Sequence, residues 1–215
     1  MTLAADLYFS FRSPYSYLAV GRYRQLAEDY AVDIALKPVY PLAVRQPDFF
    51  ERNHPNWLGY TMRDMFRVAQ MEGIPFGPPR PDPIVQNPMT REIAADQPYI
   101  RRITRLGQAA ARRGKGLGFA AEAGRLIWGG AVNWHEGEHL AGAAGRAGLD
   151  LAELDAEIAA EADTLDAEIA ANQQALEDAG HWGVPTLVCE GEPFFGQDRI
   201  AMARWRMEQK GLVRR

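Results

Sequence analysis

Three short segments of the chain contain residues whose types and surroundings could do chemistry. The first is Ser13-Pro14, where an alternating apolar stretch (residues 6–11) ends and an apolar stripe of helical spacing begins. Serine is a common helix N-cap, and proline suits the first helical position because its missing amide proton would be unpaired there anyway. A hydroxyl at a helix N-terminus also lies at the positive end of the helix dipole, where it can stabilise an anion such as a thiolate. Ser13 is therefore predicted to be a helix cap and is a candidate catalytic residue.

The second and third segments flank a predicted β-hairpin near the end of the chain. GVPT (183–186) precedes its first strand, and a cis Val184–Pro185 bond there would present the Val184 amide and carbonyl to an extended peptide ligand. GQDR (196–199) opens the last predicted helix, where free amides could hold a carboxylate and Asp198 an ammonium group. An acidic residue in a first helical turn also complements the helix dipole, so Asp198 has a purely structural explanation as well.

Hydrophobic periodicity predicts the elements that position these segments. Residues 6–11 and 32–36 alternate with period two and are predicted strands, and residues 14–30 between them have helical spacing. Near the other end, a helix over 164–178 precedes a hairpin of strands Thr186–Cys189 and Pro193–Phe195, and a last helix starts near Gln197. The two ends of the chain thus supply a βαβ unit and an αββα unit.

Residues 39–163 between these units are predicted to be helical, with Pro and Gly interrupting the pattern. The proline-rich segment 75–88 is predicted to be a loop. The predicted helices are Asn56–Glu72, Thr90–Arg113, Glu122–Trp128, Asn133–Ala147 and Leu151–Ala162. The sequence therefore predicts an α/β protein in which a helical insertion (39–163) divides a domain formed by residues 1–38 and 164–215.

The three segments, in this order, resemble the 2-hydroxychromene-2-carboxylate isomerase family. That family is grouped with kappa-class glutathione transferases and DsbA-like proteins among thioredoxin folds. The resemblance rests on FSFRSPYSYLA (9–19), GVPT (183–186) and FFGQDRI (194–200), and extends in the middle of the chain to Tyr60, Arg63-Asp64, Arg67 and Ile74-Pro75-Phe76. It implies a thioredoxin-like domain interrupted by an all-helical insertion. SPYS (13–16) stands where thioredoxins have Cys-x-x-Cys, so both redox sulfurs are absent.

The resemblance implies glutathione as cofactor and assigns roles to single residues. Ser13 matches the catalytic serine that hydrogen-bonds the glutathione sulfur. GVPT matches the loop that pairs with the glutathione backbone, and GQD (196–198) matches the group that binds its γ-glutamyl end. The residues expected to bind glutathione are Ser13, Val184, Pro185, Gly196, Gln197 and Asp198. Asn53, Trp57 and Tyr60 are expected in the substrate pocket. Where the family has a ligand-contacting lysine this chain has Trp57, which weakens the case for a carboxylate-bearing substrate of the usual kind.

The implied activity belongs to aromatic degradation: isomerisation of 2-hydroxychromene-2-carboxylate, or a related unsaturated aromatic 2-oxo acid, by reversible addition of the glutathione thiolate. Two alternatives stay open, a kappa-class-like glutathione transferase and a glutathione- or peptide-binding module without turnover. Disulfide exchange is disfavoured because SPYS has no thiol. The resemblance also implies a homodimer that acts on a small molecule.

Other motifs in the sequence have simpler explanations. HEGEH (135–139) matches the H-E-x-x-H zinc pattern, but Gly145 stands at the third histidine position of its extended form. Asn133 and Glu136 have the spacing of a capping box, which predicts a helix start here, and no metal site is expected. The basic segment 101–115 fits a solvated helix face, and GKGLG (114–118) lacks the third glycine of a dinucleotide site. Cys189 is predicted to be a buried apolar residue.

Composition excludes several classes of function. Of 215 residues, 24 are basic and 28 acidic, and the net charge of −4 gives no general attraction to nucleic acid or anionic membranes. No apolar run approaches the roughly 18 residues that span a bilayer, and the first residues lack a basic segment followed by an apolar export core. A single cysteine forms no internal disulfide. We expect a cytoplasmic protein that binds neither nucleic acid nor membrane.

Overall fold

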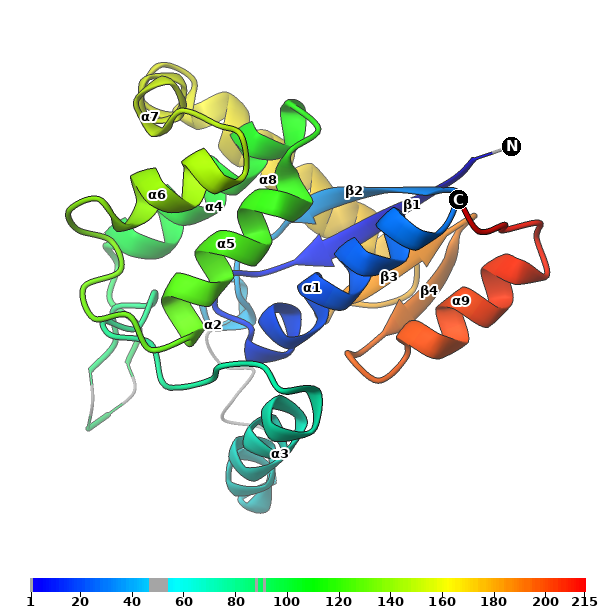
Figure 1. The fold of residues 1–215 in the computed structure, drawn as a ribbon. Coiled ribbons are helices and arrows are strands. Elements are labelled where there is room, and N and C mark those ends of the chain that lie inside the picture. The colour runs from blue at the N-terminus through cyan, green and yellow to red at the C-terminus, as the bar shows by residue number, and fades with distance from the viewer. Residues whose placement is uncertain (1, 47–53, 88, 91) are drawn as a thin grey trace.

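The computed structural model describes residues 2–46, 54–87, 89–90 and 92–215, and Figure 1 shows how their helices and strands are arranged. A mixed four-stranded sheet has the order β2-β1-β3-β4. Strands β1 (Leu3–Phe9) and β2 (Val32–Pro38) are parallel, whereas β3 (Thr186–Cys189) pairs antiparallel with β1, and β4 (Glu192–Phe195) antiparallel with β3. The predicted α/β class is confirmed, and strands from both ends of the chain form one sheet.

The chain leaves β1 two residues earlier than the alternating pattern predicts. The strand ends at Phe9 instead of Phe11, because the Ser13 amide donates to the Ser10 carbonyl at 3.0 Å and closes a turn. Helix α1 (Pro14–Asp29) then follows at the predicted position, with Ser13 as its N-cap. Together β1, α1 and β2 form the crossover connection that parallel strands require.

Helices dominate the described residues between β2 and β3, as predicted, and a last helix follows β4. These helices are α2 Leu42–Arg45, α3 Asn56–Glu72, α4 Pro98–Arg112, α5 Gly116–Trp128, α6 His139–Arg146, α7 Leu151–Ala160, α8 Ala162–Asp178 and α9 Ile200–Glu208. In Figure 1, α1 and α9 lie in front of the sheet, α8 passes behind it, and α3 extends away from the other helices. Residues 75–87 are not helical, as their prolines predict.

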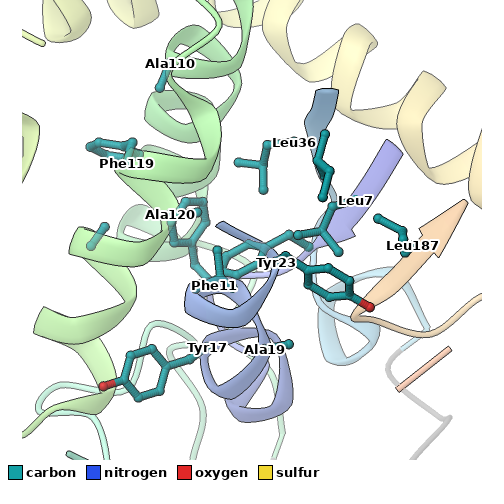
Figure 2. Close-up of a cluster of buried hydrophobic side chains, with 14 of the residues drawn as sticks. Leu7, Phe11, Tyr17, Ala19, Tyr23, Leu36, Ala110, Phe119, Ala120 and Leu187 are labelled. Atoms are coloured by element: carbon teal, nitrogen blue, oxygen red, sulfur yellow. The ribbon is translucent and has the colours of Figure 1, made fainter. Parts of the chain in front are cut away.

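The core that holds the site in place lies between the sheet and helices α1, α4 and α5. Figure 2 shows Leu7, Leu36 and Leu187, one from each of three strands, gathered with Phe11 and Tyr23. All five are buried, and each buried leucine of this kind contributes about 1.5–3 kcal/mol to stability. Helix α4 approaches closely through Gly107, since a Cβ there would lie 2.6 Å from the Phe11 ring.

Helix α4 begins at Pro98, whereas the sequence predicts a helix from Thr90. The side chain of Gln97 holds the preceding segment in an irregular conformation. Its Oε1 accepts from the Val85 amide at 2.9 Å, and its Nε2 donates to the carbonyls of Val85 and Ala94 at 2.8 Å each. The contacts with Val85 join residues 12 positions apart in sequence, and helical periodicity does not report them.

Three further helix starts also differ from the prediction. Helix α5 begins at Gly116 instead of Glu122, and its start packs so closely on β2 that a Cβ at Gly116 would lie 2.7 Å from the Leu36 Cβ. Helix α6 begins at His139, since Asn133 has a φ of 53° and is not an N-cap. Helix α9 begins at residue 200 instead of 197, after a turn in which the Arg199 amide donates to the carbonyl of residue 196.

Candidate active site

Ser13 lies where the start of α1 meets the loop before β3. Its Oγ accepts a hydrogen bond from the Ser16 amide at 3.2 Å, so the predicted N-cap is confirmed. The same hydroxyl donates to the Val184 carbonyl at 3.3 Å, across 171 positions of sequence. The fold thus brings together the first two segments that the sequence singled out.

The loop before β3 has the cis-proline geometry that the sequence position and the family resemblance together predict. The Val184–Pro185 peptide bond is cis, and Thr186 Oγ1 donates to the Gly183 carbonyl at 2.7 Å within the same loop. Pro185 is buried, whereas Val184 is partly exposed. Among the described residues, the Val184 amide has no hydrogen-bond acceptor. Its N–H is therefore available to a ligand that lies along this edge.

The turn before α9 is joined to this loop. The Gly196 amide donates to the Pro185 carbonyl at 2.9 Å, so all three segments from the sequence meet. Gly196 has a φ of 109°, and a Cβ at this position would lie 2.6 Å from Asp198 Oδ1. The carboxylate of Asp198 therefore folds back over Gly196, and any larger residue would displace it. Asp198 also forms an ion pair with Arg199.

Arg22 of α1 is a functional candidate that the sequence analysis did not identify. Its Nη2 donates to Gln197 Oε1 at 2.6 Å, and its Nη1 lies 3.2 Å from Glu72 Oε1 at the end of α3. The guanidinium therefore connects α1, α3 and the turn before α9. No local pattern identifies it, because its partners lie 50 and 175 positions away.

Helix α3 is attached to the start of α1 by a second polar contact. The Tyr15 hydroxyl donates to Asp64 Oδ2 at 2.6 Å. Burial and the neighbouring Asp64 raise the pKa of Tyr15 well above its usual value, and the Tyr60 phenol contributes in the same direction. Tyr15 thus stays a neutral donor throughout the neutral pH range. The RD pair at 63–64 within the family resemblance was the available signal for this contact.

Two of the residues expected in the substrate pocket lie on α3, the helix that Asp64 joins to the start of α1. Trp57 and Tyr60 lie at the start of α3 and share with Asp64 the helix face that meets Tyr15, since residues three and four positions apart lie side by side. Trp57 is 40% exposed and Tyr60 57% exposed. Asn53 lies outside the described residues. Tyr60 acts on the Tyr15 phenol electrostatically, and Trp57 lies one turn nearer the N-terminus of α3.

A cation and stacked aromatic rings lie at Phe11 and Arg12, the two residues that precede Ser13. Arg12 binds both carboxylate oxygens of Asp82 at 2.5 and 2.8 Å and lies 5.7 Å from the Trp128 ring centre. The Trp128 ring stacks on Phe76 at 5.7 Å, and its Nε1 donates to the Phe11 carbonyl at 3.0 Å. The proline-rich loop is therefore held against the residue that precedes Ser13.

The competing motifs do not build a second catalytic centre. His135 lies in a turn before α6 and packs on Tyr99 at 4.4 Å, so HEGEH does not place its histidines on one helix face, and the predicted capping box at Asn133 is wrong. Within the described ranges, no group of three or more His, Cys, Asp or Glu side chains could hold a metal ion. Cys189 is buried as predicted, and this burial raises the pKa of its thiol. In the described part of the chain, no helix has both the length and the apolar character to cross a membrane.

A hydroxyl at a helix start beside β1, opposite a cis-proline loop before β3, defines a thioredoxin-like protein without the thioredoxin thiols. The family model for the DSBA-like thioredoxin domain matches residues 4–208, and the chain belongs to this family. The predicted family resemblance and fold class are thereby confirmed. A search among curated proteins found no match.

Solved structures show the same fold along nearly the whole chain. A 2-hydroxychromene-2-carboxylate isomerase is 24% identical with a TM-score of 0.67, over 96% of this chain and 95% of that one. A probable DsbA oxidoreductase from Streptomyces coelicolor is 16% identical with a TM-score of 0.67, over 96% and 89%. The cytosolic disulfide reductase DsbM from Pseudomonas aeruginosa, in a structure with GSH, is 19% identical with a TM-score of 0.63, over 96% and 100%.

Proposed function

We propose that this protein is a glutathione-dependent isomerase of 2-hydroxychromene-2-carboxylate or a related unsaturated aromatic 2-oxo acid. The observation that carries the proposal is the position of the Ser13 hydroxyl, at the N-terminus of α1 and 3.3 Å from the Val184 carbonyl of the cis-proline loop. The neighbouring structures named as an isomerase and as a reductase with GSH support it. The absence of thiols at 13 and 16 favours a non-redox use of glutathione.

In this proposal, glutathione lies as an extra extended segment along the loop before β3. The Val184 N–H and carbonyl bind its cysteinyl backbone, and the turn at 196–198 binds its γ-glutamyl end. Its sulfur then lies at the start of α1, where Ser13 Oγ–H donates to the thiolate. The Tyr15 amide has no acceptor among the described residues and adds a second donor. Both donors favour the thiolate over the thiol at neutral pH.

The reaction then needs no redox step. For the hydroxychromene, the ring C–O bond of the hemiketal first breaks and the hydroxyl proton passes to the departing phenolic oxygen, which leaves an open-chain 2-oxo acid. The thiolate adds to the β-carbon of the alkene conjugated with its 2-oxo group, a C–S bond forms, and the π electrons move to the ketone oxygen as an enolate. The former double bond is now single and rotates. The enolate collapses, the C–S bond breaks, and the double bond returns in the other geometry with glutathione released. No proton, electron or atom is gained or lost overall.

The aromatic rings that α3 exposes suit a flat aromatic acid as the reacting partner. Trp128 is buried against Phe76 and Arg12, whose charge Asp82 balances, so these residues support the neighbouring surface. Tyr60 and Trp57 approach from α3. We include in the proposal a homodimer and a cytoplasmic location, since glutathione is abundant there and the DsbM neighbour is named as cytosolic.

The experiment is a product analysis with the purified protein, excess substrate and a small amount of glutathione. An isomerase converts many substrate molecules per glutathione and leaves free thiol constant. Stoichiometric loss of free thiol with a thioether product would replace the isomerase by a kappa-class-like transferase. If calorimetry shows glutathione binding but no 2-oxo acid tested is turned over, the protein is a binding module. If glutathione does not bind, the isomerase, the transferase and the binding module are all overturned.

A further inference from the structure

The Arg22 side chain is held from three sides at the edge of the candidate glutathione site. Its Nη2 donates to Gln197 Oε1 at 2.6 Å, its Nη1 lies 3.2 Å from Glu72 Oε1, and its Nε donates to the Leu18 carbonyl at 3.2 Å. The side chain is 26% exposed. Such a cation is both fixed in position and balanced in charge by Glu72.

This contact determines which way round the Gln197 amide lies. A guanidinium group has five N–H donors and no acceptor, so only the carbonyl oxygen of the amide can face it. The Gln197 Nε2 group is therefore on the side away from Arg22, with two N–H donors to offer. Without Arg22 the amide could rotate by half a turn and present its oxygen, which repels a carboxylate, in place of its donors.

Among the side chains of the turn, Gln197 is the neutral donor, because Arg199 is paired with Asp198. The main-chain amides of Gln197 and Asp198 have no acceptor among the described residues and can add to its contact with a carboxylate. The Gly196 amide is already bound to the Pro185 carbonyl at 2.9 Å, and the Asp198 carboxylate lies folded over Gly196. Asp198 repels a ligand carboxylate but attracts an ammonium group. An amino-acid-like end, with one ammonium and one carboxylate, fits a turn in which Asp198 takes the first and Gln197 Nε2 the second.

We propose that Arg22 is a positioning residue which orients Gln197 and so makes the site specific for the α-carboxylate of the γ-glutamyl group. The inference rests on the proposed function, because it takes glutathione as the ligand. Ser13 and the cis-proline loop bind the cysteinyl part of the ligand, whereas Arg22 adds a requirement for the α-carboxylate. The affinity of a thiol compound that lacks this carboxylate should therefore not depend on Arg22.

The test compares two ligands by calorimetry. One is glutathione, and the other is the analogue in which 4-aminobutyrate replaces the γ-glutamyl residue, so that the amine stays and the α-carboxylate is absent. Arg22→Met keeps most of the apolar stem of the side chain and removes the cation. We expect about tenfold weaker binding of glutathione, as for loss of one hydrogen bond to a charged group, and less than about twofold change for the analogue.

Two further comparisons show that Arg22 acts through Gln197. Arg24 lies on the same helix and pairs only with Glu28 among the described residues, so Arg24→Met is a matched control that should leave both affinities unchanged. In a protein with Gln197→Met, adding Arg22→Met should weaken glutathione binding by less than about twofold, because coupled residues are not additive. Full additivity of the two losses would overturn the inference.

The remaining outcomes separate this inference from the proposed function. If the wild-type protein binds glutathione and folded Arg22→Met loses both ligands equally, Arg22 is merely structural and the inference fails alone. If the wild-type protein binds neither ligand, the proposed function fails and the inference with it. Should Arg22→Met not fold, Gln197→Glu keeps an acceptor for Arg22 but removes the Nε2 donors. It should weaken glutathione by about tenfold or more and the analogue by less than about twofold, and equal losses would overturn the inference.

Discussion

At the scale of single residues, Ser13 combines a structural and a chemical role in one hydroxyl group. Its oxygen has two lone pairs and one proton. A lone pair caps α1 by accepting from the Ser16 amide, and the proton points to the Val184 carbonyl over a long 3.3 Å contact. A long hydrogen bond is weak, so this proton can turn towards a thiolate at little cost while the cap stays in place.

Ser13→Ala should therefore reduce turnover much more than glutathione binding. We expect kcat to fall about 10²-fold, because the lost donor acts on the charged sulfur, and Kd for glutathione to rise only a few-fold. The lost cap should also lower the free energy of unfolding by about 1 kcal/mol. Steady-state kinetics, calorimetry and urea denaturation measure the three effects.

Asp150→Ala is the matched control for this prediction. Asp150 caps α7 by accepting from the amides of Ala152 and Glu153, and Figure 1 places α7 far from the start of α1. It should lose similar stability with unchanged kcat. A Ser13→Ala protein with wild-type kcat would remove the hydroxyl from the mechanism.

Cys189 should behave as a buried side chain and not as a redox centre. Burial is the main cause that raises the pKa of its thiol, and the nearby Glu190 adds to the effect. Less thiolate is therefore present at any given pH than in free cysteine. We expect labelling by a thiol reagent at pH 8 to be at least about tenfold slower than for free glutathione, and to become fast only in denaturant. Cys189→Ala should keep full activity, and a loss of turnover with an intact fold would show that the thiol takes part.

At the scale of elements, α3 depends on α1 for its position. The Tyr15–Asp64 and Arg22–Glu72 contacts join the two helices, and the Tyr17 hydroxyl donates to the Pro75 carbonyl at 2.7 Å just beyond α3. These polar contacts place the α3 face that carries Trp57 and Tyr60. A substitution that loosens α3 should therefore weaken binding of the reacting partner more than binding of glutathione.

Two Tyr→Phe substitutions on α1 should have opposite effects on stability. Tyr15→Phe removes a hydrogen bond to a carboxylate and should lower the free energy of unfolding by about 1–2 kcal/mol. Tyr23 is fully buried and its hydroxyl has no partner among the described residues. Tyr23→Phe should therefore be neutral or stabilising by up to about 1 kcal/mol. Urea denaturation compares the two proteins.

Hydrogen exchange shows which segments lose stability when the Tyr15 hydroxyl is removed. In Tyr15→Phe, amides of residues 56–72 should exchange faster while those of β1 stay unchanged, since local opening reports local contacts. In Tyr23→Phe no segment should exchange faster. Uniform acceleration in Tyr15→Phe would mean that the contact supports the whole fold and not α3.

Element bounds were predictable where a local signal fixed them. Ser13-Pro14 marks the start of α1, and Gly73, with a φ of 65°, ends α3 as expected for a left-handed C-cap. The starts of α4 and α6 were not predictable in this way. Gln97 acts on Val85 from 12 positions away, and Asn133 adopts a left-handed conformation that the capping-box pattern does not show.

The residues of the candidate site also differ in whether a local sequence signal identifies them. Ser13, Val184 and the turn at 196–198 stand at element junctions, so the sequence could single them out, and the family resemblance gave them roles. The pairs Arg22–Gln197 and Arg12–Asp82 link positions 175 and 70 residues apart. Their residues are unremarkable in local sequence, and only the folded chain brings them together.

At the scale of the whole molecule, the helices between β2 and β3 are fastened to the end of the sheet by polar contacts around Asp166. Arg105 binds both oxygens of Asp166 at 2.8 and 2.6 Å, and the Tyr40 hydroxyl donates to it at 2.7 Å. Nearby, Asn172 Nδ2 donates to the Pro38 carbonyl at 3.0 Å. Residues after β2, on α4 and on α8 therefore share one cluster, and we expect them to unfold together with the sheet.

The Asp166 cluster should make part of the stability depend on pH. The hydrogen bonds from Arg105 lower the pKa of Asp166 in the folded state, and those from Tyr40 add to the effect. A carboxyl with a depressed folded pKa stabilises the fold above its unfolded pKa of about 3.9, and this stabilisation is lost as pH falls through the folded pKa. Asp166→Asn should therefore lower the free energy of unfolding at pH 7 by about 1–3 kcal/mol, with a smaller difference from wild type at pH 3.

Urea denaturation at pH 7, 5 and 3 measures this prediction, with Glu28→Gln as the control. Glu28 pairs with Arg24 on the exposed face of α1, and an exposed pair of this kind contributes less than about 1 kcal/mol. Its substitution should change stability little at every pH. The difference between wild type and Asp166→Asn should be similar at pH 7 and 5, because both lie above the unfolded pKa, and should shrink only at pH 3. A difference that stays constant down to pH 3 would show that the carboxylate charge does not join these helices to the sheet, and packing alone would then hold them there.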